Sequence, residues 1–228
     1  TGGRICTLGD EDEVEESNPP AMLYVEFSPD GRKIVSYDDD GNGQIWSARN
    51  GRELLPHGAF CGHREWSAAH FLWDVYVVSI GDNELSVWKA ADGDSDEAAA
   101  PLSDENDIVG TLLPDTFSTD FSRVIAEDDA RGDLWIVNVL NRKIETKLVG
   151  HEGRPNCSQF TIERDRVATA SEDGIVRVWD ACDGVELLME CFSRPVDRVS
   201  FSPDGRTLAC SERGGRVVLL DVSRTRAM

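Results

Sequence analysis

Hydrophobic and polar residues alternate along short segments of this chain, and turn-forming residues separate the segments. Residues 32–37 read "RKIVSY" and residues 44–48 read "QIWSA", with β-branched and aromatic residues at strand-like intervals. The longest apolar runs, such as "VYVVSI" at 75–80, have the length of strands, and no segment has the periodicity of a convincing amphipathic helix. The pattern therefore predicts an all-β protein.

Two hairpins are indicated by the same turn sequence. Residues 27–36 read "FSPDGRKIVS" and residues 201–211 read "FSPDGRTLACS", so a Pro-Asp-Gly turn lies between two strand-like runs in each. Proline presets φ for the turn and glycine supplies the positive φ. Each sequence therefore predicts two strands joined by a tight turn.

An aromatic strand position recurs along the chain. "DDDGNGQIWSARNG" (38–51) aligns with "SEDGIVRVWDACDG" (171–184) and with "IGDNELSVWKAADG" (80–93), and weaker copies lie at 129–138 and 212–221. The aromatic position is held in turn by Trp46, Trp88, Val137, Trp179 and Leu220, at spacings of 42, 49, 42 and 41 residues. The longest interval contains an acidic insertion at 92–107. Such a period predicts a repeat architecture.

The dipeptide Gly-His precedes two of these copies, at 62–63 and 150–151. With the Trp-bearing strand and "VWD" at 178–180, the pattern resembles the WD-repeat family of β-propellers, in which each blade has four strands. The resemblance covers nearly the whole chain. It implies a propeller with five visible blades at about 21–60, 61–113, 114–150, 151–192 and 193–228, and with residues 4–8 as an outer strand of the last blade.

Two arrangements fit this strand count. Five blades could close into a ring in which residues 4–8 complete the last blade, or the chain could be part of a larger propeller. The absence of an initial Met and the ending "SRTRAM" favour the second arrangement.

The resemblance also implies a buried hydrogen-bonded tetrad in the best-matching blades. In the fourth copy its members would be His151, Ser171, Asp173 and Trp179. The second copy retains three members and has Ile80 in the serine position, and the first copy retains two. These retained members are His63, Asp82 and Trp88 in the second copy and Asp40 and Trp46 in the first.

The string at 38–43 has a second interpretation as a cation site. Asp38, Asp40 and Asn42 match the opening of an EF-hand calcium loop, but the twelfth position is Arg49, where calcium requires a bidentate carboxylate. The flanking segments also predict strands, whereas an EF-hand lies between helices. We therefore interpret the string as a tight turn within a blade and retain a weak cation site at these three residues as the alternative.

Charge and composition limit the possible partners. The formal net charge is −20, with 43 acidic and 23 basic residues, which argues against nucleic-acid binding and favours a basic partner. Neither a signal peptide nor a membrane span is recognisable in the sequence. Several of the six cysteines lie in apolar strand patterns such as "TLACS", and none forms a Cys-x-x-Cys pair. We expect no metal cluster and a location in the cytoplasm or nucleus.

No catalytic motif is present in the sequence. Neither Gly-x-Ser-x-Gly nor His-Glu-x-x-His occurs, and no glycine-rich loop leads into a helix. We therefore expect neither an enzyme nor a cofactor nor a small-molecule substrate.

Loop residues of a propeller are the expected binding site for a partner. In the family, partners dock near the loop that enters the first strand and at the residue before the tight-turn Asp. By alignment these positions are Asp39, Trp66, Arg154, Asn156, Glu172, Asp197 and Arg213. We predict a protein-interaction scaffold that binds a protein or peptide on this loop face. Asp39 and Glu172 favour a basic peptide, with Arg154 as a local counter-charge.

The alternative function is a regulatory or sensor segment of a larger signalling or ubiquitin-ligase protein. "IWSAR" at 45–49 loosely resembles the W-D-x-R box by which some WD-repeat proteins dock to a cullin-ligase adaptor, with Ser47 in place of Asp.

Overall fold

The computed structural model describes residues 22–38, 43–54, 66–81, 84–90, 111–112, 116–128 and 133–225. These residues form strands and turns without a helix, which confirms the predicted all-β class. The described residues therefore contain no helix that is long and apolar enough to cross a membrane.

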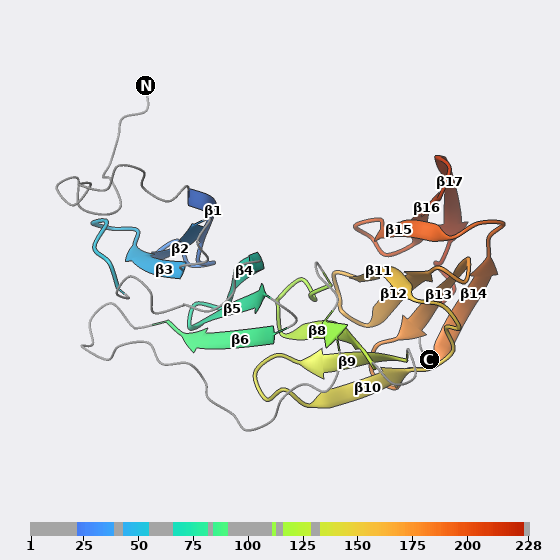
Figure 1. Ribbon diagram of the computed structural model, residues 1–228, viewed down its shortest axis with the longest axis horizontal. Coiled ribbons are helices and arrows are strands. Elements are labelled where there is room, and N and C mark those ends of the chain that lie inside the picture. The colour runs from blue at the N-terminus through green and yellow to red at the C-terminus, as the bar shows by residue number, and fades with distance from the viewer. Residues whose placement is uncertain are drawn as a thin grey trace. The chain divides into compact units, whose positions relative to one another are not determined.

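The strands form five antiparallel sheets in chain order (Figure 1). The first sheet contains β1 (Met22–Phe27), β2 (Lys33–Asp38) and β3 (Gly43–Ser47), and the second contains β4 (Trp66–Leu72), β5 (Tyr76–Gly81) and β6 (Glu84–Lys89). The third contains β7 (Thr111–Leu112), β8 (Arg123–Glu127), β9 (Leu134–Asn138) and β10 (Ile144–Leu148). The fourth contains β11 (Pro155–Phe160), β12 (Arg166–Ser171), β13 (Ile175–Asp180) and β14 (Glu186–Cys191), and the fifth contains β15 (Val196–Phe201), β16 (Thr207–Glu212) and β17 (Arg216–Asp221).

One strand differs from the predicted blade boundaries. Thr111 pairs with Glu127 and Leu112 with Ala126, so β7 belongs to the third sheet, which begins before residue 114. The predicted outer strand at 4–8 and the acidic insertion at 92–107 lie outside the described residues.

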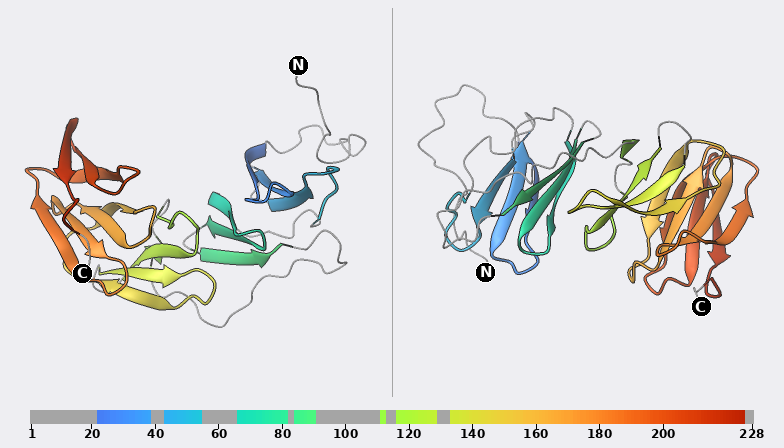
Figure 2. Two further views of the ribbon diagram at one scale, coloured as in Figure 1. Left: turned by 180° about the vertical axis from the view of Figure 1, so that it is seen from behind. Right: turned by 90° about the horizontal axis from the view of Figure 1, so that it is seen from below.

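The chain divides into two compact units, residues 1–105 and 106–228. In the first unit, buried residues of the first sheet pack on the second, including Val35, Ile45, Phe71 and Val77. In the second unit, the fourth sheet lies between the third and the fifth (Figure 2). Every residue of β12, "RVATAS", is buried, because this strand packs against a neighbouring sheet on both faces.

The turn between the first two main strands is closed by the same hydrogen bond in four sheets. A hydroxyl accepts the backbone N–H of the residue five positions later, at 2.9 to 3.2 Å, in the pairs Ser28–Lys33, Ser118–Arg123, Thr161–Arg166 and Ser202–Thr207. The residue three positions after each hydroxyl has a positive φ, and these residues are Gly31, Phe121, Arg164 and Gly205. The Pro-Asp-Gly sequence is therefore one of several sequences that form this turn.

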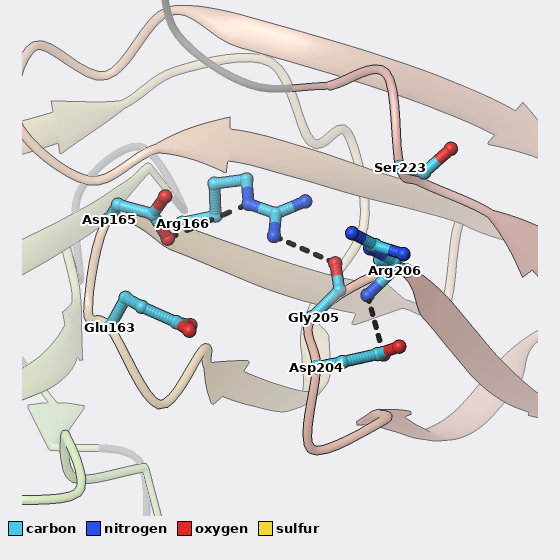
Figure 3. A pocket seen from close by; sticks show the side chains of 7 residues that line it. All are labelled: Glu163, Asp165, Arg166, Asp204, Gly205, Arg206 and Ser223. Carbon is cyan, nitrogen blue, oxygen red and sulfur yellow. Dashed lines mark hydrogen bonds and ion pairs between the residues drawn. The ribbon is translucent and has the colours of Figure 1, made fainter.

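A cation joins this turn to the next sheet in three places, an arrangement that we call the turn clamp. Lys33 Nζ donates to the backbone O of Asp74 at 2.9 Å, and Arg166 Nη2 donates to the backbone O of Gly205 at 2.7 Å (Figure 3). Arg123 Nη1 makes the third such contact, at 3.5 Å, with the backbone O of Arg164. The clamp holds neighbouring sheets in register at one end of their strands.

Candidate functional site

A buried chain of hydrogen bonds links β12, β13 and the loop that enters β11. Trp179 Nε1 donates to Thr169 Oγ1 at 2.8 Å, and Thr169 Oγ1 lies 2.7 Å from His151 Nε2. His151 Nδ1 lies 2.8 Å from Asp173 Oδ2. Since a carboxylate only accepts, Nδ1 carries the proton and Nε2 accepts the hydrogen of Thr169. Each group in the chain thereby has a partner, and the imidazole is neutral.

Thr169, not Ser171, supplies the hydroxyl of this chain, which corrects the tetrad expected from the sequence. The two residues lie on the same face of β12, but Ser171 is at its end. There Ser171 Oγ donates to the backbone O of Gly153 at 2.8 Å and accepts the backbone N–H of Asp173 at 3.2 Å. Ser171 therefore fixes the tight turn, while Thr169 connects Trp179 to His151.

The first sheet repeats part of this arrangement. Trp46 Nε1 donates to Ser36 Oγ at 2.8 Å, across the same ten-residue interval that separates Thr169 from Trp179. In the second sheet that interval leads from Trp88 to Val78, which is buried and has no hydroxyl. The side chain of Trp88 and the residues His63, Asp82 and Asp40 lie outside the described part of the chain.

The cation site considered at 38–42 is only partly described. Asp38 is a buried residue at the end of β2, whereas Asp40 and Asn42 lie outside the described residues. Among the residues that are described, no group of three or more His, Cys, Asp or Glu side chains is placed to hold a metal ion.

The environment of His151 makes this chain sensitive to acid. Burial lowers the pKa of His151 below its usual 6.5 in spite of the neighbouring carboxylate. Burial alone would raise the pKa of Asp173, but hydrogen bonds from His151 and from the backbone N–H of Ile175 outweigh it and lower the pKa. Both groups therefore bind protons more weakly in the folded state than in the unfolded state.

We expect acid to loosen the fourth sheet in the window set by His151. As the pH falls below 6.5 towards the folded-state pKa, the unfolded state binds a proton that the folded state does not, so stability decreases. Asp173 causes a separate loss of stability as the pH falls below 3.8, its usual pKa. Hydrogen–deuterium exchange of peptides from β12 and β13, corrected for the intrinsic rate, should show less protection at pH 5.5 than at pH 7.5. The His151→Gln variant should lose most of this difference, and an equal difference in both proteins would contradict the assignment to His151.

Five of the predicted partner-binding residues meet where the fourth sheet adjoins the fifth, and we call them the inter-sheet cluster. They are Arg154, Asn156, Glu172, Asp197 and Arg213. Arg213 is the centre: its Nη2 and Nη1 bind the two carboxylate oxygens of Glu172 at 2.7 and 3.1 Å, and its Nε binds Asp197 Oδ1 at 3.0 Å. Asn156 donates to the backbone O of Val196 at 3.0 Å. The contacts of Glu172 and Asn156 cross from the fourth sheet to the fifth, whereas the contact between Arg213 and Asp197 lies within the fifth sheet.

The inter-sheet cluster is exposed and already electrically paired. The side chains of Arg213, Glu172 and Asp197 are 51%, 40% and 42% exposed. The hydrogen bond from Arg213 is the largest cause of a lowered pKa at Glu172, and the same bond raises the pKa of Arg213. Arg213, rather than Arg154 alone, is the counter-charge of Glu172. A basic group of a partner would therefore compete with Arg213 for these carboxylates.

Two other predicted contact residues are described in part or not at all. Trp66 is the first residue of β4 and pairs with Gly81, but its side chain lies outside the described atoms. Asp39 lies outside the described residues.

A second titratable cluster, which the sequence did not indicate, lies between the first two sheets. Tyr24 donates its hydroxyl hydrogen to Glu26, and Glu26 Oε2 lies 2.7 Å from His70 Nδ1. Burial is the largest cause of a raised pKa at Tyr24, so the phenol stays protonated and is a poor nucleophile. The hydrogen bonds from His70 and Tyr24 keep the pKa of Glu26 low although burial opposes this. The cluster serves to hold β1 against β4.

The described cysteines are all free thiols with different exposure. Cys210 is buried, as expected from "TLACS", and burial raises its pKa to about 12, which makes it unreactive. Cys182 and Cys191 are exposed, so the expectation of burial does not extend to them.

Comparisons with known proteins agree with this fold. The family model described as "WD domain, G-beta repeat" matches residues 142–180, which run from β10 of the third sheet to β13 of the fourth. Human apoptotic protease-activating factor 1 is 27% identical over 82% of the chain, and the guanine nucleotide-binding protein subunit beta of Oryza sativa subsp. indica is 27% identical over 89%. Coronin-7 of Rattus norvegicus is 31% identical over 91%.

The chain spans only part of each of these relatives: 15% of the apoptotic factor, 57% of the rice subunit and 26% of the coronin. Among solved structures, "KlHsv2 with loop 6CD replaced by a Gly-Ser linker" has a similar fold. The TM-score is 0.62 with 13% sequence identity, over 89% of this chain and 78% of the other.

Proposed function

Because the chain belongs to the WD-repeat family of β-propellers, we propose that it is a non-catalytic scaffold that binds a protein or peptide on exposed loops. WD repeats form protein-interaction domains, and rigid sheets that present loops are suited to this role. The scaffold requires no cofactor. Its partner is a protein or peptide, without a role for nucleic acid or membrane, and its location is the cytoplasm or nucleus.

The observation that best supports this proposal is the arrangement of the inter-sheet cluster. Arg213, Glu172 and Asp197 are exposed, yet their mutual hydrogen bonds fix them in one arrangement before a partner arrives. Such preorganisation lowers the entropic cost of binding. A partner with a basic group facing Glu172 and Asp197 and an acidic group facing Arg213 would match the charges of the cluster. A basic peptide that displaces Arg213 remains the simplest ligand of this type.

We expect capture of the partner to depend on this cluster. The bait is the full chain, immobilised in cell lysate, and the variant carries Glu172→Ala, Asp197→Ala and Arg213→Ala, which removes all three charges together. A partner bound through the cluster should be retained about tenfold less by the variant, equivalent to ~1.4 kcal/mol of binding energy. Quantitative mass spectrometry of the captured proteins gives the ratio.

Two further baits make the result specific. Asp120→Ala with Arg164→Ala removes another exposed ion pair of the same unit and should retain the partner fully. Asp39→Ala with Trp66→Ala tests the candidates of the first unit. Equal capture by wild type and the cluster variant, with loss in the Asp39 and Trp66 variant, would move the site to the first unit. Equal capture by all baits would contradict a site at any of these residues.

A second function is a regulatory propeller segment within a larger signalling or ubiquitin-ligase protein. It is favoured by the length of the relatives, since the chain spans 15% of human apoptotic protease-activating factor 1. In that case the partner of the inter-sheet cluster would be another segment of the same parent protein.

A further inference from the structure

The first unit has a groove at one end of its sheets, the end at which the β1–β2 turn lies. The groove has a volume of about 750 Å³ and lies between that turn, residues 47–50 and Leu54 at and beyond the end of β3, and the β4–β5 turn. Leu54 and Val75 supply its apolar lining. Since strands β1 and β2 are antiparallel, this end of the first sheet is opposite to the end that leads into residues 39–42. The groove is therefore separate from the loop positions proposed above.

The acidic side chains of the groove are used by its own turns. Asp30 Oδ1 accepts the hydroxyl of Ser28 at 2.7 Å and the backbone N–H of Arg32 at 2.9 Å. The hydrogen bond from Ser28 is the largest cause of a lowered pKa at Asp30, so this carboxylate stays ionised as part of the turn. Asp74 Oδ1 accepts the backbone N–H of Asp30 at 2.8 Å and so ties the two turns together.

Two of the three basic side chains of the groove, those of Arg32 and Arg49, are exposed to solvent. The side chain of Arg32 is 85% exposed, and its Nε forms an ion pair with Asp30 Oδ2 at 3.8 Å, too long for a hydrogen bond. Arg49 is exposed at the start of the segment after β3. Lys33 is buried beneath them and donates to the backbone O of Asp74. Three cations against two turn-bound carboxylates make the groove locally positive in a chain whose net charge is −20.

The equivalent groove between the fourth and fifth sheets has the opposite balance of charge. It has a volume of about 460 Å³ and is lined by three carboxylates, of Glu163, Asp165 and Asp204, against two arginines (Figure 3). Arg166 is buried and already donates to backbone oxygens, and only Arg206 is exposed. Positive charge is therefore a property of the first groove and does not follow from the repeat.

We propose that the groove of the first unit binds an acidic peptide segment of a partner protein. Carboxylates of the peptide pair with the exposed guanidinium groups of Arg32 and Arg49, and an apolar side chain between them packs on Leu54 and Val75. Trp73, in the β4–β5 turn next to the groove, is 50% exposed and adds apolar surface at that turn. A groove of this volume is in the range that accommodates ligands of a few residues.

Fluorescence anisotropy of a labelled peptide with the sequence GELEDLEG tests this proposal on the full chain. The expected result is saturable binding that weakens when NaCl is raised from about 50 to 300 mM, because exposed charges are screened. The matched peptide GQLQNLQG, which has no charge, should bind at least about tenfold more weakly. The double variant Arg32→Glu with Arg49→Glu should lower the affinity for GELEDLEG by at least about tenfold.

Arg206→Glu is the matched control, because it reverses an exposed arginine in the other groove. It should leave the affinity for the acidic peptide within about twofold of wild type. Equal loss in Arg206→Glu and in the double variant would show a response to overall charge and overturn the proposal. Equal binding of the two peptides would show that the groove recognises apolar side chains and not carboxylates, and would also overturn the proposal. The thermal transition of each variant, which should match wild type since all three arginines are exposed, shows that folding is intact.

Discussion

Replacing Thr169 by Val should destabilise the fourth sheet by about 2–5 kcal/mol, although the side chain keeps its shape. Trp179 Nε1 and His151 Nε2 both depend on the Thr169 hydroxyl, and Trp179 and His151 are buried. Leaving a buried polar group without a partner costs ~1–3 kcal/mol, and here two groups are affected. Thermal denaturation, with hydrogen exchange of peptides from β12 and β13 to locate the effect, measures the loss.

Two further variants test whether the loss of stability comes from the hydroxyl group. Thr169→Ser retains the hydroxyl and should stay within about 1 kcal/mol of wild type. Ser36→Ala in the first sheet removes the partner of one indole alone, so it should cost ~1–3 kcal/mol. If Thr169→Val and Thr169→Ser were equally stable, the hydrogen-bonded chain would have no stabilising role.

Arg166→Met should produce the second large effect, a loss of about 2–3 kcal/mol between the fourth and fifth sheets. Arg166 donates to the backbone O of Gly205 at 2.7 Å and of Val222 at 3.0 Å, and its guanidinium lies 5.6 Å from the ring centre of Phe201. Methionine keeps the apolar stem but leaves the carbonyl of Gly205 without this donor. A hydrogen bond to a charged donor contributes ~1.5–3 kcal/mol, partly offset here by the cost of burying the charge.

The matched control is Arg164→Met, two residues earlier in the same turn. Arg164 forms an exposed ion pair with Asp120, and such pairs contribute at most about 1 kcal/mol. Hydrogen exchange should increase in peptides from β15–β17 in Arg166→Met and not in Arg164→Met. Equal exchange in both variants would show that the turn clamp does not hold these sheets together.

The sequence predicted the fold well because a repeat reveals itself through its period. Apart from the interval that contains the acidic insertion, the aromatic strand position recurs every 41 or 42 residues, although the third and fifth copies have Val137 and Leu220 there. Trp46, Val137 and Trp179 are all buried. The identity of the buried hydroxyl was less predictable. Thr169 and Ser171 lie on one face of one strand, and only the reach of the Trp179 indole along that strand distinguishes them.

The alignment predicted which positions lie on the loop face, but it did not predict which of their side chains contact one another. The alignment indicated Glu172 and Arg213, which are 41 residues apart, but not that Arg213 neutralises Glu172. The contact between Glu26 and His70 crosses two sheets and leaves no local pattern in the chain. Pairings of this kind depend on how neighbouring sheets pack, and a single sequence carries no signal for them.

The turn clamp has a consequence for how such a chain can evolve. In all three places the acceptor is a backbone oxygen, and the residues that provide it are Asp74, Arg164 and Gly205, which have nothing in common as side chains. The donor therefore needs no particular side chain in the acceptor turn, although a Cβ at Gly205, where φ is +63°, would lie 2.7 Å from Arg166 Nη2. A duplicated unit could therefore form the same contact with the unit before it, and many substitutions in the acceptor turn would leave that contact in place. Gene duplication followed by divergence is thus easy for this architecture, in accord with copies that retain their spacing after losing most of their shared residues.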